Sequence, residues 1–151
     1  PGDFARAGKW YRAALRDSLS APGDGGATLS VIHSRLGIMS FGKGANEASL
    51  ASFMHATTYR SAPAVVWSNL GFALFRNARF AESARAFTTT LRMDSSDVNA
   101  LYCLGRLTLG NPATALSGRW LLQRFLIRER NTARSADAER MLAAAIIPTQ
   151  Q

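Results

Sequence analysis

Apolar positions along the chain follow a helical period. Between residues 67 and 97, apolar side chains recur at steps of three and four in two runs, which the polar stretch 76–79 separates. Steps of this size place the apolar side chains on one face of a helix. The pattern therefore predicts two amphipathic helices of about a dozen residues each, joined by a short turn.

The same pattern returns at a spacing of 34 residues along the chain. The positions that share this step are Leu36-Gly37, Leu70-Gly71 and Leu104-Gly105; Ser49, Ser83 and Ser117; Phe53, Phe87 and Leu121; and Phe41 with Phe75. A fixed period of this length is typical of stacked helix pairs, in which each pair buries its apolar face against the next. We therefore expect an all-α solenoid.

The segment Trp67-x-x-Leu70-Gly71-x-x-Leu74, followed by the small residue Ser83 four positions before Phe87, resembles the tetratricopeptide repeat family. The resemblance extends from about residue 2 to residue 125 and implies a right-handed solenoid of antiparallel helix pairs, with about eight helices here. The sequence departs from the family pattern in three places: serine replaces the usual alanine of the second helix, no proline closes the Trp67 repeat, and leucine replaces tryptophan at position 101.

We expect the chain to form a single domain, 1–151, which the repeat spacing divides into smaller units. We expect a half repeat at 2–17, a Gly- and Pro-rich loop at 18–28, repeats at 29–62, 63–97 and 98–130, and a capping helix at 132–146. The half repeat is a second helix without its first, and so we also expect sequence that precedes it. Ser96 or Asp97 is expected to cap the helix that begins at Val98.

The last repeat contains a helix that is apolar on nearly every side. We expect it to run from Ala113 to about Arg130, with Asn111 as its N-cap and Pro112 at its first position. A helix of this kind must be covered on more than one side. The terminal helix is expected to cover one side through Ala138, Met141, Leu142 and Ala145.

The charge balance of the chain favours acidic partners. Its 151 residues contain 18 Lys and Arg against 10 Asp and Glu, which gives a formal net charge of +8. Such a balance suits nucleic acid or anionic protein surfaces, although a GC-rich genome also enriches arginine and alanine. A single cysteine and the lack of a long apolar run predict an intracellular protein, cytoplasmic or mitochondrial.

Residue types that carry chemistry are few and scattered. His33 and His55 lie on different predicted helices without Cys, Asp or Glu at a metal-binding interval, and we interpret them as structural. Cys103 has no candidate base and is expected to be a buried, unreactive thiol. We therefore expect no catalytic residue, no metal and no cofactor.

The resemblance implies that partners bind on the concave face, which the first helices of the pairs form. Positions transferred from the family to this face are Val31, Ser34, Ile38, Phe41, Val65, Ser68, Phe72, Phe75, Arg76, Asn99, Tyr102, Arg106 and Leu109. This set predicts a peptide or subunit that offers apolar anchors and acidic groups. The alternative is that Phe72, Phe75 and Tyr102 only pack between helices. The carboxylate clamp of co-chaperones in this family is largely missing, because Asn69 alone stands at a matching position.

These features predict a non-catalytic scaffold or adaptor that serves as a subunit or assembly factor of a larger complex. The alternative is a nucleic-acid-associated organellar or ribosomal assembly protein that uses the basic region 106–134, since arginine forks suit phosphate. The basic patch of this alternative consists of Arg119, Arg124, Arg128, Arg130 and Arg134. These arginines alternate with apolar residues, and no nucleic-acid-binding motif accompanies them.

Overall fold

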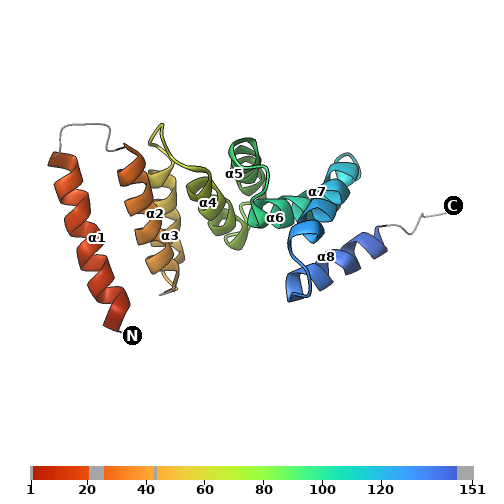
Figure 1. The fold of residues 1–151 in the computed structure, drawn as a ribbon, viewed down its shortest axis with the longest axis horizontal. Coiled ribbons are helices and arrows are strands. Elements are labelled where there is room, and N and C mark those ends of the chain that lie inside the picture. The colour runs from red at the N-terminus through yellow and green to blue at the C-terminus, as the bar shows by residue number, and fades with distance from the viewer. Residues whose placement is uncertain (1, 21–25, 43, 146–151) are drawn as a thin grey trace.

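The computed structural model describes residues 2–20, 26–42 and 44–145. This part of the chain forms eight α-helices that lie in a row, with α1 and α8 at opposite ends (Figure 1). Their bounds are α1 Gly2–Ser20, α2 Gly26–Gly42, α3 Asn46–Ala56, α4 Ala64–Arg76, α5 Phe80–Met93, α6 Val98–Leu109, α7 Ala115–Arg128 and α8 Ala133–Ala144.

The helices pack as antiparallel pairs, α2 with α3, α4 with α5 and α6 with α7, and each pair stacks on the next. The first helices α2, α4, α6 and α8 also contact one another in turn, whereas the second helices α3, α5 and α7 make no such contact with each other. A stack whose first helices approach most closely curves toward them. The concave side is therefore the side of α2, α4, α6 and α8, and the prediction of an all-α solenoid is confirmed.

Each pair is held together by a glycine that lies against a large apolar side chain. A Cβ added to Gly71 would lie 2.8 Å from the ring of Phe87, and one added to Gly37 would lie 2.8 Å from Phe53. Phe87 has no exposed surface, and Phe53 is also buried. The Leu-Gly step of the sequence therefore marks the point where the two helices of a pair come closest.

The serine that replaces alanine in the second helices has a specific partner. Ser83 Oγ donates a hydrogen bond of 2.8 Å to the carbonyl of Gly71, and Ser49 Oγ does the same to Gly37 at 2.8 Å. Both hydroxyls are buried, where an unpaired polar group is costly. The departure from the family pattern thus adds a hydrogen bond to the closest contact within each of these two pairs.

The third pair departs from the 34-residue period. This corrects the expected equivalence of Ser117 with Ser83 and of Leu121 with Phe87. The N-cap of the second helix follows the glycine by eight residues in the first two pairs (Gly37 to Ala45, Gly71 to Arg79) but by nine in the third (Gly105 to Thr114). Every later position of α7 therefore moves on by one. The residues that face Gly105 are accordingly Gly118 and Leu122, while Ser117 is exposed.

Several helix boundaries also differ from those expected. Helix α7 begins at Ala115 after the N-cap Thr114, and so Asn111 and Pro112 belong to the turn instead of the helix start. Residues 18–20 and 26–28 of the expected loop are helical, and 21–25 lie outside the described residues. Of the two candidate caps of α6, Asp97 fills the role by accepting 2.7 Å from the amide of Ala100.

Helix α8 occupies the place of a further first helix. Tyr102 of α6 contacts Asp137 of α8, and Asn99 of α6 contacts Arg134 of α8. The two residues of each pair are 35 positions apart, which equals the repeat length of 34 plus the one extra residue of the third pair. Ala138 of α8 is fully buried, and Met141 and Leu142 pack against the same core, while Ala145 is exposed. The opposite side of α7 stays exposed at Leu116, Trp120 and Ile127, so the expected cover on a second side is not found among the described residues.

Candidate partner-binding face on the first helices

Helices α2 and α4 form a hollow on the concave side. Its volume is about 160 Å³, and its lining consists of Val31, Ser34, Arg35, Ile38, Val65, Val66 and Asn69. Three apolar side chains of this lining are partly or largely exposed, Val65 most of all at 56%. Exposed aliphatic side chains around a hollow are suited to receive an apolar anchor of a partner.

An aromatic pair with an arginine lies next along the same face. The rings of Phe41 on α2 and Phe72 on α4 meet edge to face with centroids 6.0 Å apart, and the guanidinium of Arg76 lies 5.9 Å from the Phe41 centroid. Phe72 is 41% exposed. Arg76 and Arg35 have no ion pair with any residue that the structure describes, which leaves both available to an acidic partner.

Arg106 connects the second and third pairs of the face. Its guanidinium lies 5.6 Å from the ring centroid of Phe75 and 5.4 Å from that of Tyr102, and its Nε is 4.0 Å from Asp137 Oδ2. The hydroxyl of Tyr102 donates a 2.7 Å hydrogen bond to the same carboxylate. Burial, followed by this bond to Asp137, raises the pKa of Tyr102. These contacts join α4, α6 and α8, and the exposed Arg106 places a positive charge on their outer surface.

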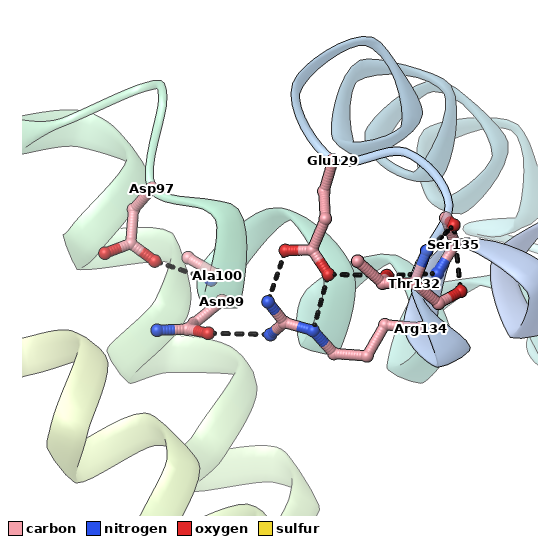
Figure 2. A network of polar contacts seen from close by, with 7 residues as sticks. All are labelled: Asp97, Asn99, Ala100, Glu129, Thr132, Arg134 and Ser135. Atoms are coloured by element: carbon pink, nitrogen blue, oxygen red, sulfur yellow. Dashed lines mark hydrogen bonds and ion pairs between the residues drawn. The ribbon is translucent and has the colours of Figure 1, made fainter.

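A second polar network fixes α8 to α6 at the end of the face (Figure 2). Arg134 forms an ion pair with Glu129 and donates 2.8 Å to Asn99 Oδ1. Thr132 and Ser135 close a capping box at the start of α8. The hydrogen bond from Arg134 holds the pKa of the Glu129 carboxyl below its usual value.

The structure separates the predicted face residues by exposure. Side chains that are open to solvent are Val31, Ile38, Val65, Phe72, Arg76, Asn99 and Arg106, and those that are half-buried are Phe41, Phe75 and Leu109. Tyr102 is 7% exposed and packs 5.0 Å from Phe125, and Ser34 and Ser68 are buried as well. Tyr102 therefore packs between helices, which is the alternative given above, and it lies beneath the partner-binding face instead of lining it.

The arginines of the predicted basic patch do not gather on one surface. Arg134 lies at the α6–α8 junction with Glu129, and its guanidinium stacks over Tyr102 and Phe125. Arg124 instead stacks 4.6 Å over Trp120 on the outer side of α7. The set therefore belongs to two sides of the solenoid.

The family's carboxylate clamp stays incomplete in three dimensions. Asn69 Nδ2 donates a 3.1 Å hydrogen bond to Ser34 Oγ, which joins α4 to α2. The amide is thus engaged between neighbouring first helices, at the edge of the α2–α4 hollow.

One cluster was missed at the level of sequence, because its members are separated along the chain. The imidazoles of His33 on α2 and His55 on α3 stack with centroids 4.0 Å apart, and Tyr59 lies 5.9 Å and 5.7 Å from them. Burial, and then the neighbouring His55, lowers the pKa of His33. The signal was present in the repeat, since His33 stands 34 residues before Trp67, at a position that faces the paired helix.

Other chemistry-bearing groups lie apart from this face. Burial raises the pKa of the Cys103 thiol to about 11, so the thiolate is scarce at neutral pH. Among the described side chains, no three of the His, Cys, Asp and Glu type gather as metal ligands. None of the helices described is both long and apolar enough to cross a membrane.

Comparison with solved structures identifies the fold. The chain superposes on a TPR domain of Arabidopsis OM64 with a TM-score of 0.70 at 16% identity, covering 80% of this chain and 98% of that one. A tetratricopeptide repeat protein from Parabacteroides merdae gives 0.74 at 17% identity, covering 95% of this chain and 54% of the other. No family model matches the sequence, and neither does any curated protein.

A third similar structure is the first TPR domain of Spaghetti (RPAP3) bound to the HSP90 peptide SRMEEVD, with a TM-score of 0.69 at 16% identity over 79% of this chain and 94% of that one. At these identities the likeness concerns the fold. The protein therefore has the tetratricopeptide repeat fold, as the resemblance implied, and this fold is an architecture of stacked helix pairs with an extended concave surface.

Proposed function

We propose that the protein is a non-catalytic scaffold or adaptor that holds an acidic peptide or helix of a partner on the face of α2, α4 and α6. The observation that carries the proposal is the exposed Phe72, packed edge to face on Phe41, with Arg76 beside this pair and without an ion pair among the described residues. A rigid aromatic anchor beside a cation is a common arrangement of binding hot spots.

The chemistry of the expected partner comes from the charges along this face. Arg35, Arg76 and Arg106 come from α2, α4 and α6, and Asp137 is the carboxylate that lies near the last of them. The apolar hollow between α2 and α4 continues the surface. A segment with one or two apolar anchors and nearby Asp or Glu residues matches this arrangement. The peptide named with RPAP3, SRMEEVD, has this composition, which supports an acidic ligand for the fold.

The mode of capture is expected to differ from a terminal carboxylate clamp. Asn69 is committed to Ser34, and position 38, where the family has a clamp residue, holds an isoleucine. We infer that internal acidic side chains, and not a chain end, face the arginines. A free carboxylate at the peptide terminus should therefore add little to affinity.

Selection from a random peptide library displayed on phage tests the proposal. The wild-type chain should enrich peptides that combine apolar anchors with Asp or Glu, and a matched chain with Arg35→Glu and Arg76→Glu should enrich basic peptides instead. Enrichment of the same peptides by both chains, or of no class by either, would show that this face does not select acidic partners. Circular dichroism of both chains controls for folding.

The nucleic-acid alternative remains a prediction with its own test. A generic RNA or DNA titrated at rising salt should show no binding if the scaffold proposal holds. Micromolar affinity that falls steeply with salt would favour the alternative.

A further inference from the structure

The outer side of α7 carries an apolar stripe that lies directly opposite the core. Leu116, Trp120 and Ile127 are 82%, 54% and 68% exposed, and they recur along one side of the helix. The core-facing residues of α7, Gly118, Leu121, Leu122 and Phe125, occupy the other side. A helix with two apolar sides needs a second cover.

A hollow opens beside this stripe, where α5 and α7 diverge over α6. Its volume is about 260 Å³, and it is lined by Thr88, Leu91, Arg92, Ser95, Leu101, Leu104, Trp120 and Arg124. Leu101 stands 34 residues after Trp67, so a smaller side chain fills this position in the third pair. The smaller leucine leaves room for an apolar side chain of a partner between α5 and α7.

The rim of the hollow is already in place without a partner. Arg124 stacks 4.6 Å over the ring of Trp120 and donates a 3.2 Å hydrogen bond to the carbonyl of Ser95, which precedes α6. These contacts hold the indole and the guanidinium in one orientation. A site that is organised before binding loses less conformational entropy when the partner binds.

The charge of this surface selects the kind of partner. Helix α7 carries Arg119, Arg124 and Arg128 and no carboxylate, and α5 adds Arg85 and Arg92. The nearby Asp94 accepts hydrogen bonds of 2.6 Å and 2.9 Å from the hydroxyl and amide of Ser96, which lower its pKa together with the charge of Arg128. The arginines of this surface outnumber this carboxylate. A second copy of this chain, whose net charge is +8, would bring like charges together on this face.

We propose that the α5–α7 surface, on the convex side, is a second docking site, and that its occupant is an acidic amphipathic helix of a partner protein. The helix lies along Leu116, Trp120 and Ile127, inserts one apolar residue into the 260 Å³ hollow, and presents its carboxylates to Arg92, Arg124 and Arg128. A helix is the matching shape because the stripe follows one side of α7, as in the helix pairs of the solenoid itself.

Fluorescence anisotropy with designed helical peptides tests this site on the full chain. The probe is a labelled peptide of about 18 residues, or five helical turns, with Leu and Phe on one face and Glu on the other. The expected result is saturable binding that Trp120→Ser weakens at least about tenfold. The double change Arg92→Glu with Arg128→Glu should weaken it similarly, because both side chains are exposed and neither is part of the core.

The controls separate this site from the concave face and from general attraction of charge. Because the concave face is also proposed to bind acidic segments, these titrations are made in a chain that already carries Arg35→Glu and Arg76→Glu, where the α5–α7 surface is the proposed site that remains for the peptide. A peptide with Lys in place of Glu should not bind.

Three results would overturn the proposal. One is no binding of the acidic peptide; a second is a peptide affinity that Trp120→Ser leaves unchanged. The third is binding of an RNA oligonucleotide with the same dependence on Trp120 and Arg128 while the peptide fails, which would assign the surface to nucleic acid.

Discussion

The hydroxyl of Ser83 donates a hydrogen bond to the carbonyl of Gly71 at 2.8 Å, at the point where α4 and α5 lie closest. The same bond joins Ser49 to Gly37 one repeat earlier, also at 2.8 Å. In both pairs the glycine faces a buried phenylalanine, so the approach depends on the absence of a side chain. Stability of the pair therefore rests on a glycine that no larger residue can replace without movement.

Replacing Gly71 with Ala should destabilise the fold by about 1–3 kcal/mol. The new methyl group would lie 2.8 Å from the Phe87 ring, which is fully buried and has no room to withdraw. Urea denaturation followed by circular dichroism measures the change. Gly42→Ala is the matched control, because nothing lies within 4 Å of a Cβ at that helix end. Equal stability of the two variants would show that the close approach is not required.

Ala78→Gly should stabilise the chain by about 1 kcal/mol. Ala78 has φ of 56° in the turn between α4 and α5, a conformation that costs little for glycine and more for alanine. Gly44, 34 residues earlier, has φ of 75° in the equivalent turn. Thermal unfolding should show a higher midpoint for the variant. A lower midpoint would mean that the alanine side chain contributes contacts that outweigh its backbone strain.

The stability of the α2–α3 pair should fall as the solution becomes mildly acidic. The pKa of His33 in the folded chain lies below 6.5, so the unfolded chain binds more protons below that pH. The free energy of unfolding should therefore be highest above about pH 6.5 and decrease as pH falls through the folded pKa. Urea titrations across this range measure the slope.

His33→Asn should remove that slope, since the titrating imidazole is gone. Tyr59→Phe is the control, because it retains the stacked histidines and should keep the slope of the wild type. A slope that persists in His33→Asn would assign the pH dependence to other groups.

Arg134→Ala should weaken the attachment of α8 by about 1–2 kcal/mol. The change removes an ion pair with Glu129, a hydrogen bond to Asn99 and stacking over Tyr102 and Phe125. Hydrogen exchange should show faster exchange of α8 amides. Arg140→Ala on the same helix is the control; its side chain is 77% exposed, and we expect nearly wild-type exchange.

The spacing of apolar positions was sufficient to predict the helix pairs, and the repeated Leu-Gly step coincides with the contact of Gly71 with Phe87 that the structure shows. It failed in the third pair, because the repeat alone does not reveal the extra residue before Thr114. That single residue moves Gly118 to the place expected for Ser117. Register within a helix is set by its cap, and a cap without a strong sequence signal cannot be placed by periodicity alone.

The candidate site could be predicted in outline but not in detail. The exposure of Phe72 follows from its position on a first helix. The burial of Tyr102 does not, because it depends on Asp137 and Phe125, which come from two other helices. The His33–His55 stack is likewise a contact between helices; the repeat position of His33 indicates that it faces the paired helix, but it does not indicate that His55 is its partner.

The most direct test of the central claim is the affinity of a library-selected acidic peptide, measured by isothermal titration calorimetry. We predict that Phe72→Ala raises its Kd at least about tenfold, which corresponds to about 1.4 kcal/mol, and that Arg76→Glu does the same. Trp120→Ser, on the opposite side of the solenoid, should leave Kd unchanged. Unchanged affinity in the Phe72 and Arg76 variants, with the fold intact, would contradict the assignment of the concave face as the binding site.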